Sequence, residues 1–334
     1  MSYLNNPEAF QQAYDEARAR RERGEPPISY MYEDATDGLG AREGGRAFGV
    51  EIEFDLSGAD DDDALEAIAR DLYDAGLSRY AYQGGYHSNM REGYSDAPNG
   101  WRLESDATVA GEIVSPIMYD EPQTWRNLEK VCEIVRRHGG VATYNTGGHV
   151  HVSLHDYDHT IDNHNRLLQL NAAYEDVLFR MAQNPAARQH RGTSWCRPNQ
   201  VPAGGYRSVQ EVSWRNAGHG LGLNLQAVNG GRQDHAEMRM WDGSLDPSVI
   251  QTQIKTSLAL VAAASRGAEA DQPERLGTHR QRNAHLPRGE RLRGQAWLDD
   301  TRSFRQLMDT IYRRARDKAQ ATALFASTRW QRPR

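Results

Sequence analysis

The sequence predicts an α+β protein built around a mostly antiparallel sheet. Three separate stretches alternate apolar with ionisable residues, which is typical of strands that have one covered face and one open face. Several expected strands follow one another directly through turns, a connection that joins antiparallel neighbours and cannot join parallel ones. The helical segments are interspersed among these strands, and this order argues against a doubly wound parallel sheet.

The composition argues against several classes of partner and site. The chain has 334 residues, with 40 lysines and arginines against 46 aspartates and glutamates, so its formal net charge is −6. This mild negative charge gives no reason to expect a nucleic-acid partner. No apolar run approaches the roughly 20 residues that span a bilayer, so we expect no membrane partner. The two cysteines lack the spacing of a disulfide framework or a thiolate zinc site, which indicates a reducing compartment, the cytoplasm.

The first 140 residues are expected to alternate helices with short strands. Gly24 and Gly139 each follow a helical pattern and mark its end. Pro122 stands where a first-turn proline is tolerated and opens the clearest helix. Residues 76–100, rich in Gly, Tyr and Asn, are expected to form a long loop. In chain order the expected elements are helix 7–23, strand 48–55, a helix near 64–72, strands 101–104 and 111–118, and helix 122–138.

The second half repeats this mixture of elements. The tripeptide Asn229-Gly230-Gly231 suits the turn of a hairpin. Asp246-Pro247 is a typical helix opening. The expected elements are strand 149–154, helix 161–183, a hairpin of strands 220–228 and 235–241, a helix that starts at 247, and a basic helix 302–318.

Changes in composition predict three regions. Residues 1–45 form an N-terminal extension, because a Pro- and Gly-bearing stretch without periodicity precedes the first strand. Residues 46–265 form the central domain. From about Gly267 arginines crowd a Gly- and Pro-bearing segment, so residues 266–334 are expected to form a basic, partly helical C-terminal extension.

Three of the expected strands carry ionisable residues on one face only. Side chains alternate along a strand, so residues two apart point the same way. A solvated sheet face would carry Thr, Ser and Lys with mixed charge, whereas these strands carry acids, imidazoles and a guanidinium. Their joint appearance indicates one site assembled across the sheet, to which a glutamate of a fourth strand contributes. The residues are Glu51 and Glu53, His149 and His151, His235, Glu237 and Arg239, and, in the fourth strand, Glu112.

Carboxylates that outnumber imidazoles suit hard cations, Mg²⁺ or Mn²⁺, better than zinc. Such ions attract phosphate oxygens, and an arginine on the same face can bind a phosphoryl group during its transfer. The residues alone therefore predict a metal–nucleotide site on the open face of the sheet. The sequence has no G-x-x-x-x-G-K-[ST] loop and no G-x-G-x-x-G after a strand, which argues against a P-loop or Rossmann site.

Four short motifs occur in an order that resembles the amidoligases. These are carboxylate–amine ligases of the glutamine synthetase superfamily, related to the glutamate–cysteine ligases. The resemblance covers roughly residues 46–265. The motifs are GVEIE at 49–53, EIVSP at 112–116, TGGHVH at 146–151, and EMR at 237–239 followed by DGSL at 242–245.

The resemblance implies a fold and an activity. The sheet would curve into a half-open funnel of the glutamine synthetase type, with helices on its outer face and with ATP and Mg²⁺ or Mn²⁺ inside. The enzyme would join a carboxylate to an amine, as an amide or isopeptide bond, through an acyl phosphate. Either substrate would be a small molecule or a peptide or protein side chain.

The resemblance also implies roles for individual residues. His151 would bind the nucleotide phosphates, and Asn224 would belong to the nucleotide site. Arg239 would stabilise the transferred phosphoryl group and, with Glu53, count as catalytic. The implied metal ligands are Glu51, Glu53, Glu112, His149 and Glu237. No residue is identified as the base; Asp106 is a candidate, although an aspartate at this position favours a turn.

Two alternatives remain open at this point. A cupin-like metal-dependent oxygenase also carries His-x-His, but its signature has a glutamate shortly after the second histidine, where this chain has Ser153, Leu154 and His155. The second alternative is a catalytically inactive relative that binds nucleotide only. Iron and oxygen consumption would indicate the first, and nucleotide binding without ADP release the second.

Overall fold

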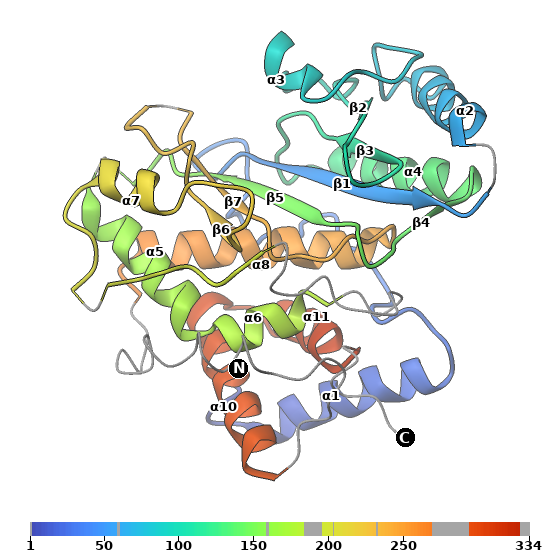
Figure 1. Cartoon of the computed structure of the whole chain (residues 1–334). Helices are drawn as coiled ribbons and strands as arrows, with labels where there is room; N and C mark the ends of the chain where they lie inside the picture. The colour runs from blue at the N-terminus through green and yellow to red at the C-terminus, as the bar shows by residue number, and fades with distance from the viewer. Residues whose placement is uncertain are drawn as a thin grey trace.

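The computed structural model describes residues 2–58, 61–157, 160–183, 196–202, 204–231, 233–268 and 294–327. A seven-stranded sheet organises these parts (Figure 1), with the order β2-β3-β1-β5-β7-β6 and β4 paired to β1. Every pair of named strands is antiparallel. The predicted α+β class and the mostly antiparallel sheet are therefore confirmed, and the sheet is open, with β2 and β6 at its edges.

The long strand β1 (Phe48–Leu56) lies in the middle of the sheet. The apolar side chains of Val50, Ile52 and Phe54 are at most 2% exposed, as alternation along the strand requires when helices cover one face. The remaining strands are β2 (Arg102–Glu104), β3 (Gly111–Val114), β4 (Gly140–Val141), β5 (Gly148–Ser153), β6 (Leu223–Asn224) and β7 (His235–Met238).

Helix α8 (Pro247–Ser265) packs beneath β5 and β1 (Figure 1). It is buried along nearly its whole length, and its N-terminus is capped by the side chain of Asp246, which accepts a hydrogen bond from Ser248 N. Helices α4 (Pro122–Arg137) and α5 (Ile161–Ala173) contact α8, and α2 (Asp61–Asp74) contacts α4 and β2. Helices thus cover the apolar face of the sheet, as the resemblance implied.

A second group of helices lies on the far side of α8 from the sheet (Figure 1). It consists of α1 (Pro7–Glu22), α6 (Glu175–Met181), α10 (Gly294–Ile311) and α11 (Ala315–Ser327). Helix α1 packs against α11, and both α10 and α11 contact α8. Buried residues of all these helices join one continuous hydrophobic core with the sheet.

The single helix expected over residues 161–183 is wrong, because the structure divides it at Tyr174. This residue has φ −109° and ψ 16°, so the helix stops there, and α6 begins at the next residue. The expected basic helix 302–318 is likewise two helices, separated by Tyr312–Arg314. The side chain of Arg314 donates to the carbonyl oxygens of Asp34 and Ala35. This tertiary contact holds the break.

The expected pairing of residues near 220–228 with 235–241 is confirmed, but the ladder is shorter than expected. Leu223 pairs with Met238, and Asn224 pairs with Glu237. The connection is a loop rather than a two-residue turn, and the carboxylate of Asp234 accepts from the N–H groups of residues 229–231 at 2.9–3.1 Å.

The expected long loop at residues 76–100 is largely irregular, with a five-residue helix α3 (Ser88–Glu92) inside it. A further short helix, α7 (Val209–Arg215), precedes β6. The arginine-rich stretch 269–293 lies outside the described residues. In the part of the chain that the structure describes, no helix combines the length and apolar character needed to cross a membrane. The boundaries of the three predicted regions stay predictions.

Candidate functional site

Strand register brings the predicted site residues side by side. Glu51 on β1 lies opposite His149 on β5, and Glu53 lies opposite Glu112 on β3. Residues directly opposite in neighbouring strands share a face of the sheet. Because the two pairs join positions that are 98 and 59 residues apart in the chain, the site depends on the sheet rather than on any local motif.

The same arrangement continues toward the β6 edge. His151 lies opposite Glu237, which lies opposite Asn224. Asn224 donates from Nδ2 to Oε2 of Glu237 at 2.7 Å and so fixes that carboxylate. Asn199 holds the short strand β6 in place. Its side-chain amide donates to the carbonyl oxygen of Leu223 at 2.7 Å and accepts from the N–H of Leu223 at 3.0 Å. No sequence pattern pointed to Asn199, a buried amide in an irregular segment.

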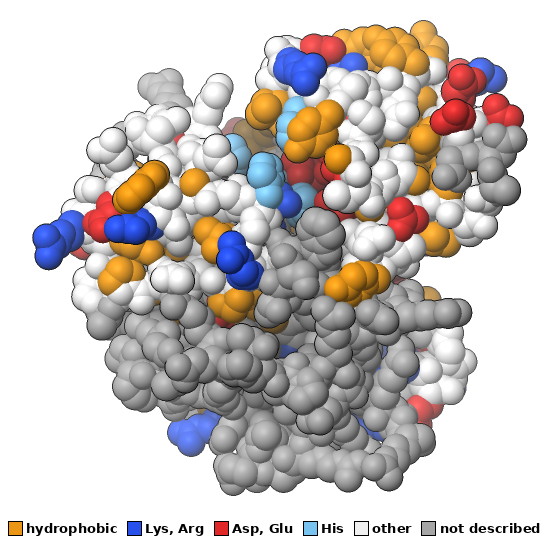
Figure 2. Space-filling view, in the orientation of Figure 1, with side chains coloured by type: hydrophobic (Ala, Val, Ile, Leu, Met, Phe, Trp, Pro, Cys, Tyr) orange, Lys and Arg blue, Asp and Glu red, His pale blue; other side chains and the backbone are white. Residues whose placement is uncertain are grey.

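The open face of the sheet forms the floor of a hollow in the molecular surface. Figure 2 shows histidine, acidic and basic side chains gathered in its depth, between the part that carries α3 and the part that carries α7. The acidic and amide side chains at this floor are largely buried, since Glu53, Glu112 and Glu237 are at most 8% exposed. Buried charges of one sign require compensation by cations or protons.

Two groups of potential metal ligands share one residue. Glu51, Glu112 and His149 offer ligand atoms that all lie within 4.8 Å of one another, and so do Glu51, His151 and Glu237. Oxygen-rich groups of this kind, each with one imidazole, fit Mg²⁺ or Mn²⁺. The second group gives His151 a possible place beside a metal, in addition to its expected contact with phosphates.

His149 provides an independent test of whether a cation fits. Its Nδ1 contacts Oε2 of Glu51 at 2.7 Å. Its Nε2 is buried and has no hydrogen-bond partner among the described residues, with Oε1 of Glu53 at 3.4 Å. An imidazole nitrogen buried without a partner costs free energy, and coordination of a cation would remove that cost. The donor set therefore fits a divalent metal.

Glu51 and His151 stabilise each other's charged forms. Burial would raise the pKa of Glu51, but the charge of His151 and hydrogen bonds from His149 and His151 outweigh it and hold this pKa well below its usual range. Burial would lower the pKa of His151, yet the neighbouring Glu51 outweighs it and raises this pKa. Without a metal the imidazolium supplies the positive charge that the carboxylate needs.

Glu112 shows the opposite behaviour. Burial, followed by the negative charges of Glu51 and Glu53, raises the pKa of Glu112 well above its usual value. A carboxylate destabilised in this way gains the most from a nearby cation, because the cation removes both the repulsion and part of the desolvation cost.

Glu53 is held from the loop that precedes β5. Its Oε2 accepts a hydrogen bond from Gly147 N at 2.5 Å, and its Oε1 lies 3.4 Å from Nε2 of His149. It is not a member of either ligand group among the described residues. Its role as a ligand stays a prediction, whereas its position beneath His149 is established.

Arg239 follows Glu237 by two residues, so its side chain lies on the same face of the sheet. Its guanidinium donates to Oε1 of Glu237 and contacts Nδ1 of His149 at 3.4 Å, while Nε donates to the carbonyl oxygen of His219 at 3.1 Å. Burial would lower the pKa of Arg239, but Glu237 outweighs it and raises this pKa further, so the side chain stays cationic. It is the guanidinium that the site offers to an anionic group.

Glu104, at the edge of the site, was not predicted as a site residue from the sequence. Glu104 lies opposite Glu112 in the sheet and accepts from the N–H groups of Ser88 and Asn89 at 2.9 and 2.7 Å, which anchors α3 beside the site. Glu104 follows the apolar Leu103, and this alternation of apolar and acidic residues could have indicated that it faces the site. Asp106 accepts from Thr108 N and Oγ1 at 2.7 Å, which is the turn role predicted for it.

One comparison with known protein families bears on the motifs that carry these residues. Residues 44–203 match the sequence model of the family described as "Putative amidoligase enzyme", so the resemblance noted in the motifs is confirmed over this part of the chain. The family's description names an amidoligase, an enzyme that joins a carboxylate to an amine through a C–N bond. No curated protein matches the sequence.

A solved structure of the complex between the prokaryotic ubiquitin-like protein Pup and its ligase PafA is similar to this chain at 10% identity and a TM-score of 0.37. The similarity covers 84% of this chain and 63% of that one. The chain thus spans less than two thirds of the length of the chain it resembles.

Proposed function

We propose that this chain, which carries an amidoligase sequence over residues 44–203, is an ATP- and Mg²⁺- or Mn²⁺-dependent carboxylate–amine ligase. It forms an amide or isopeptide bond through an acyl phosphate, with a catalytic unit at residues 46–265. The observation that carries the proposal is the pair of ligand groups that share Glu51, with the guanidinium of Arg239 beside them. A cationic group next to two divalent-metal sites suits a triphosphate.

Bound Mg²⁺ or Mn²⁺ would supply Lewis-acid stabilisation of the phosphate charge. Glu51, Glu112 and His149 would hold one ion, and Glu51, His151 and Glu237 would hold a second. Asn224 keeps Glu237 in place, and Gly147 keeps Glu53 in place. The protein's contribution is therefore a rigid set of ligands on neighbouring strands, which requires little rearrangement during the reaction.

In the first step a carboxylate oxygen of the substrate attacks the γ-phosphorus of ATP. The bond between this phosphorus and the β–γ bridging oxygen breaks, and ADP leaves with the electron pair. Arg239 stabilises the transferred phosphoryl group, since a guanidinium binds phosphate oxygens in a planar, bidentate manner. The product is an acyl phosphate, a much better electrophile than a carboxylate.

In the second step the amine attacks the acyl carbon. The carbon–oxygen bond to the phosphoryl group breaks, phosphate leaves with its electron pair, and the amine loses a proton to a base. The open face of the sheet leaves the hollow accessible to either a small molecule or a side chain of a peptide (Figure 2). The family match favours this chemistry over the cupin-like oxygenase.

The test measures ADP and condensation products together. The protein is incubated with Mg-ATP and a mixed library of carboxylates and amines, and products are identified by mass spectrometry. Glu53→Gln and His149→Ala should abolish metal-dependent ADP formation, because each removes a group from the floor of the site. Glu129→Gln, an exposed glutamate on α4, is the matched control and should keep full activity.

The outcomes separate the candidate functions. Wild-type turnover in Glu53→Gln would contradict the site assignment. ATP binding without ADP release over the whole library would instead indicate an inactive relative. Bound iron with oxygen consumption and no need for ATP would indicate the oxygenase.

A further inference from the structure

A cavity lined by charged and apolar side chains lies where three separate parts of the chain meet. Its volume is about 180 Å³, and it is lined by the segment 35–39, by α8, and by residues around the α10–α11 connection. None of its lining residues belongs to the candidate site on the sheet. One water molecule occupies about 30 Å³ in the liquid, so a cavity of this size has room for a small solute.

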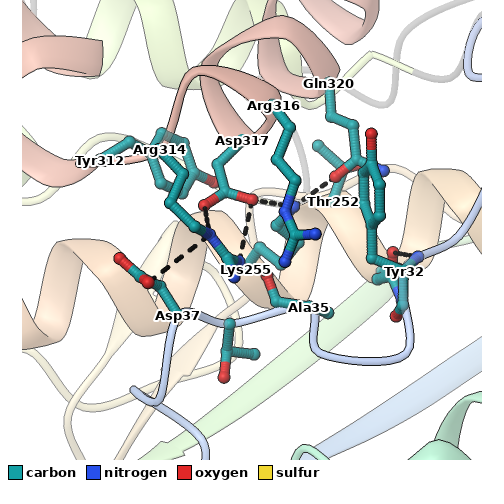
Figure 3. Close-up of polar contacts among 12 residues, drawn as sticks. Tyr32, Ala35, Asp37, Thr252, Lys255, Tyr312, Arg314, Arg316, Asp317 and Gln320 are labelled. Atoms are coloured by element: carbon teal, nitrogen blue, oxygen red, sulfur yellow. Dashed lines mark hydrogen bonds and ion pairs between the residues drawn. The ribbon is translucent and has the colours of Figure 1, made fainter. Parts of the chain in front are cut away.

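The inner wall carries charges that neutralise one another (Figure 3), and the innermost of them, Lys255 and Asp317, are buried. Lys255 Nζ lies 2.6 Å from Asp317 Oδ1, and these side chains are only 1% and 2% exposed. Arg314 lies on the other side of Asp317, with Nε at 2.7 Å from Oδ2, and also approaches Asp37 at 3.6 Å. The carboxylates of this wall are therefore already paired with Lys255 and Arg314.

Two further arginines line the cavity and are not neutralised. Arg266, at the end of α8, and Arg313, after α10, are both exposed, and neither has a carboxylate within ion-pair distance in the described parts of the chain. Partial burial lowers the pKa of Arg266, the positive charges of Arg313 and Arg46 lower it further, and the carboxylate of Asp37 offsets only part of this shift. The two guanidinium groups that line the cavity therefore repel each other.

The surroundings leave positive charge in excess. The cations are Lys255, Arg266, Arg313, Arg314 and Arg316, and the carboxylates near them are Asp34, Asp37 and Asp317. Among the described residues, these five cations against three carboxylates leave two positive charges without compensation. A dianion at the opening would match this excess, and guanidinium groups bind the oxygens of phosphate and carboxylate in the same planar geometry.

We propose that this cavity is a binding site for a small dianionic oxyanion, phosphate or a short dicarboxylate, held by Arg266 and Arg313. The bound ion contacts the segment 35–39, the end of α8 and the α10–α11 connection at once. It therefore ties the N-terminal and C-terminal segments to the central helix, at a place separate from the candidate site on the sheet. The proposal does not depend on the proposed function.

The test uses inorganic phosphate and malonate as probes, each titrated to about 10 mM at constant ionic strength and with EDTA present. Calorimetry measures affinity, and hydrogen–deuterium exchange locates the ligand. We expect slower exchange in peptides that cover residues 35–39 and 311–317. In Arg266→Gln/Arg313→Gln the affinity should fall at least tenfold and the protection should disappear.

Both substitutions are at exposed positions, so the variant should fold, and Arg266→Lys/Arg313→Lys should retain part of the affinity. Arg70→Gln/Arg207→Gln removes the same charge from exposed positions outside the cavity and should bind like the wild type. Binding of only one probe identifies which oxyanion the site takes. Failure of both probes to bind, or equal binding by the Gln double variant, would overturn the proposal.

Discussion

Glu51 connects the two groups of candidate ligands. One of its oxygens contacts His149 at 2.7 Å and the other contacts His151 at 3.1 Å. Both imidazoles therefore depend on one carboxylate for their orientation, and this carboxylate depends on them for its charge. Its neighbour Arg239 reaches His149 as well, so that the cationic and anionic residues of the site form one network.

The role of Arg239 predicts a particular kinetic effect. Arg239→Ala should lower kcat by about 100-fold, as the loss of one donor to a transition-state charge does, and should change the KM for ATP much less. Arg239→Lys keeps the positive charge without the planar pair of donors and should be intermediate. Steady-state kinetics of ADP release measures both constants. A larger effect on KM than on kcat would show that the arginine binds ground-state nucleotide instead.

Asn224 predicts an effect on metal binding. Asn224→Ala removes the hydrogen bond that positions Glu237 and should weaken Mn²⁺ binding about tenfold, as the loss of a group that orients a ligand does. Electron paramagnetic resonance of free Mn²⁺ measures this affinity. Gln226→Ala, an exposed residue two positions further on, should leave it unchanged. Equal affinities in both variants would remove Glu237 from the ligand set.

At the residue scale, the sequence predicted those site residues that strand alternation reveals. Glu51, His149 and Glu237 each stand two positions from another ionisable residue, and this period is visible without a structure. Asn199 and Asp234 were not predictable, because each acts from an irregular segment on backbone groups that only the folded chain brings near.

At the scale of elements, sequence periodicity located most helices and strands but not where helices break. The periodic apolar residues continue across Tyr174 and across Tyr312–Arg314, so the sequence indicated one helix in each case. The second break is held by Arg314, which binds carbonyl oxygens of Asp34 and Ala35 almost 280 residues earlier in the chain. Such long-range contacts leave no local pattern to find.

The packing of α1 predicts a stability effect. Phe10 is 4% exposed, and its ring lies 5.7–5.8 Å from the rings of Tyr3, Tyr14 and Phe304. Phe10→Ala should lower the free energy of unfolding by about 3 kcal/mol, since it removes a large buried ring and leaves a cavity. Gln12→Ala, on the exposed face of the same helix, should change it little. Urea denaturation measures both, and equal stabilities would mean that α1 is not part of the cooperative core.

At the scale of the whole molecule, the two ends of the described chain pack together. Asp309 on α10 accepts hydrogen bonds from Ser2 Oγ and from the N–H groups of Tyr3 and Leu4, at 2.6–2.9 Å, and it pairs with Lys318. The N-terminal segment is thereby attached to the C-terminal helices, although the sequence suggested two separate extensions.

Asp309 predicts a dependence of stability on pH. Burial would raise its pKa, but Lys318 and the hydrogen bonds from the N-terminal residues outweigh burial and lower it below its usual value. The stabilisation that this carboxylate provides is therefore present above pH 4 and is lost as the pH falls through the lowered pKa. Asp309→Asn should be less stable than the wild type at pH 7, and this difference should shrink below pH 4. Thermal unfolding at several pH values measures it; a constant difference would contradict the assignment.

The pairing of acids and imidazoles across neighbouring strands determines how metal affinity would be lost if the sheet were disturbed. Displacing β5 by one residue against β1 would turn both histidines into the helices and expose Val150 and Val152 to the hollow. Such a molecule would lose both the packing of its hydrophobic core and the candidate metal ligands on the open face of the sheet. Damage to the sheet should thus give an all-or-none loss of metal affinity across a population, and not a graded series of weakened sites.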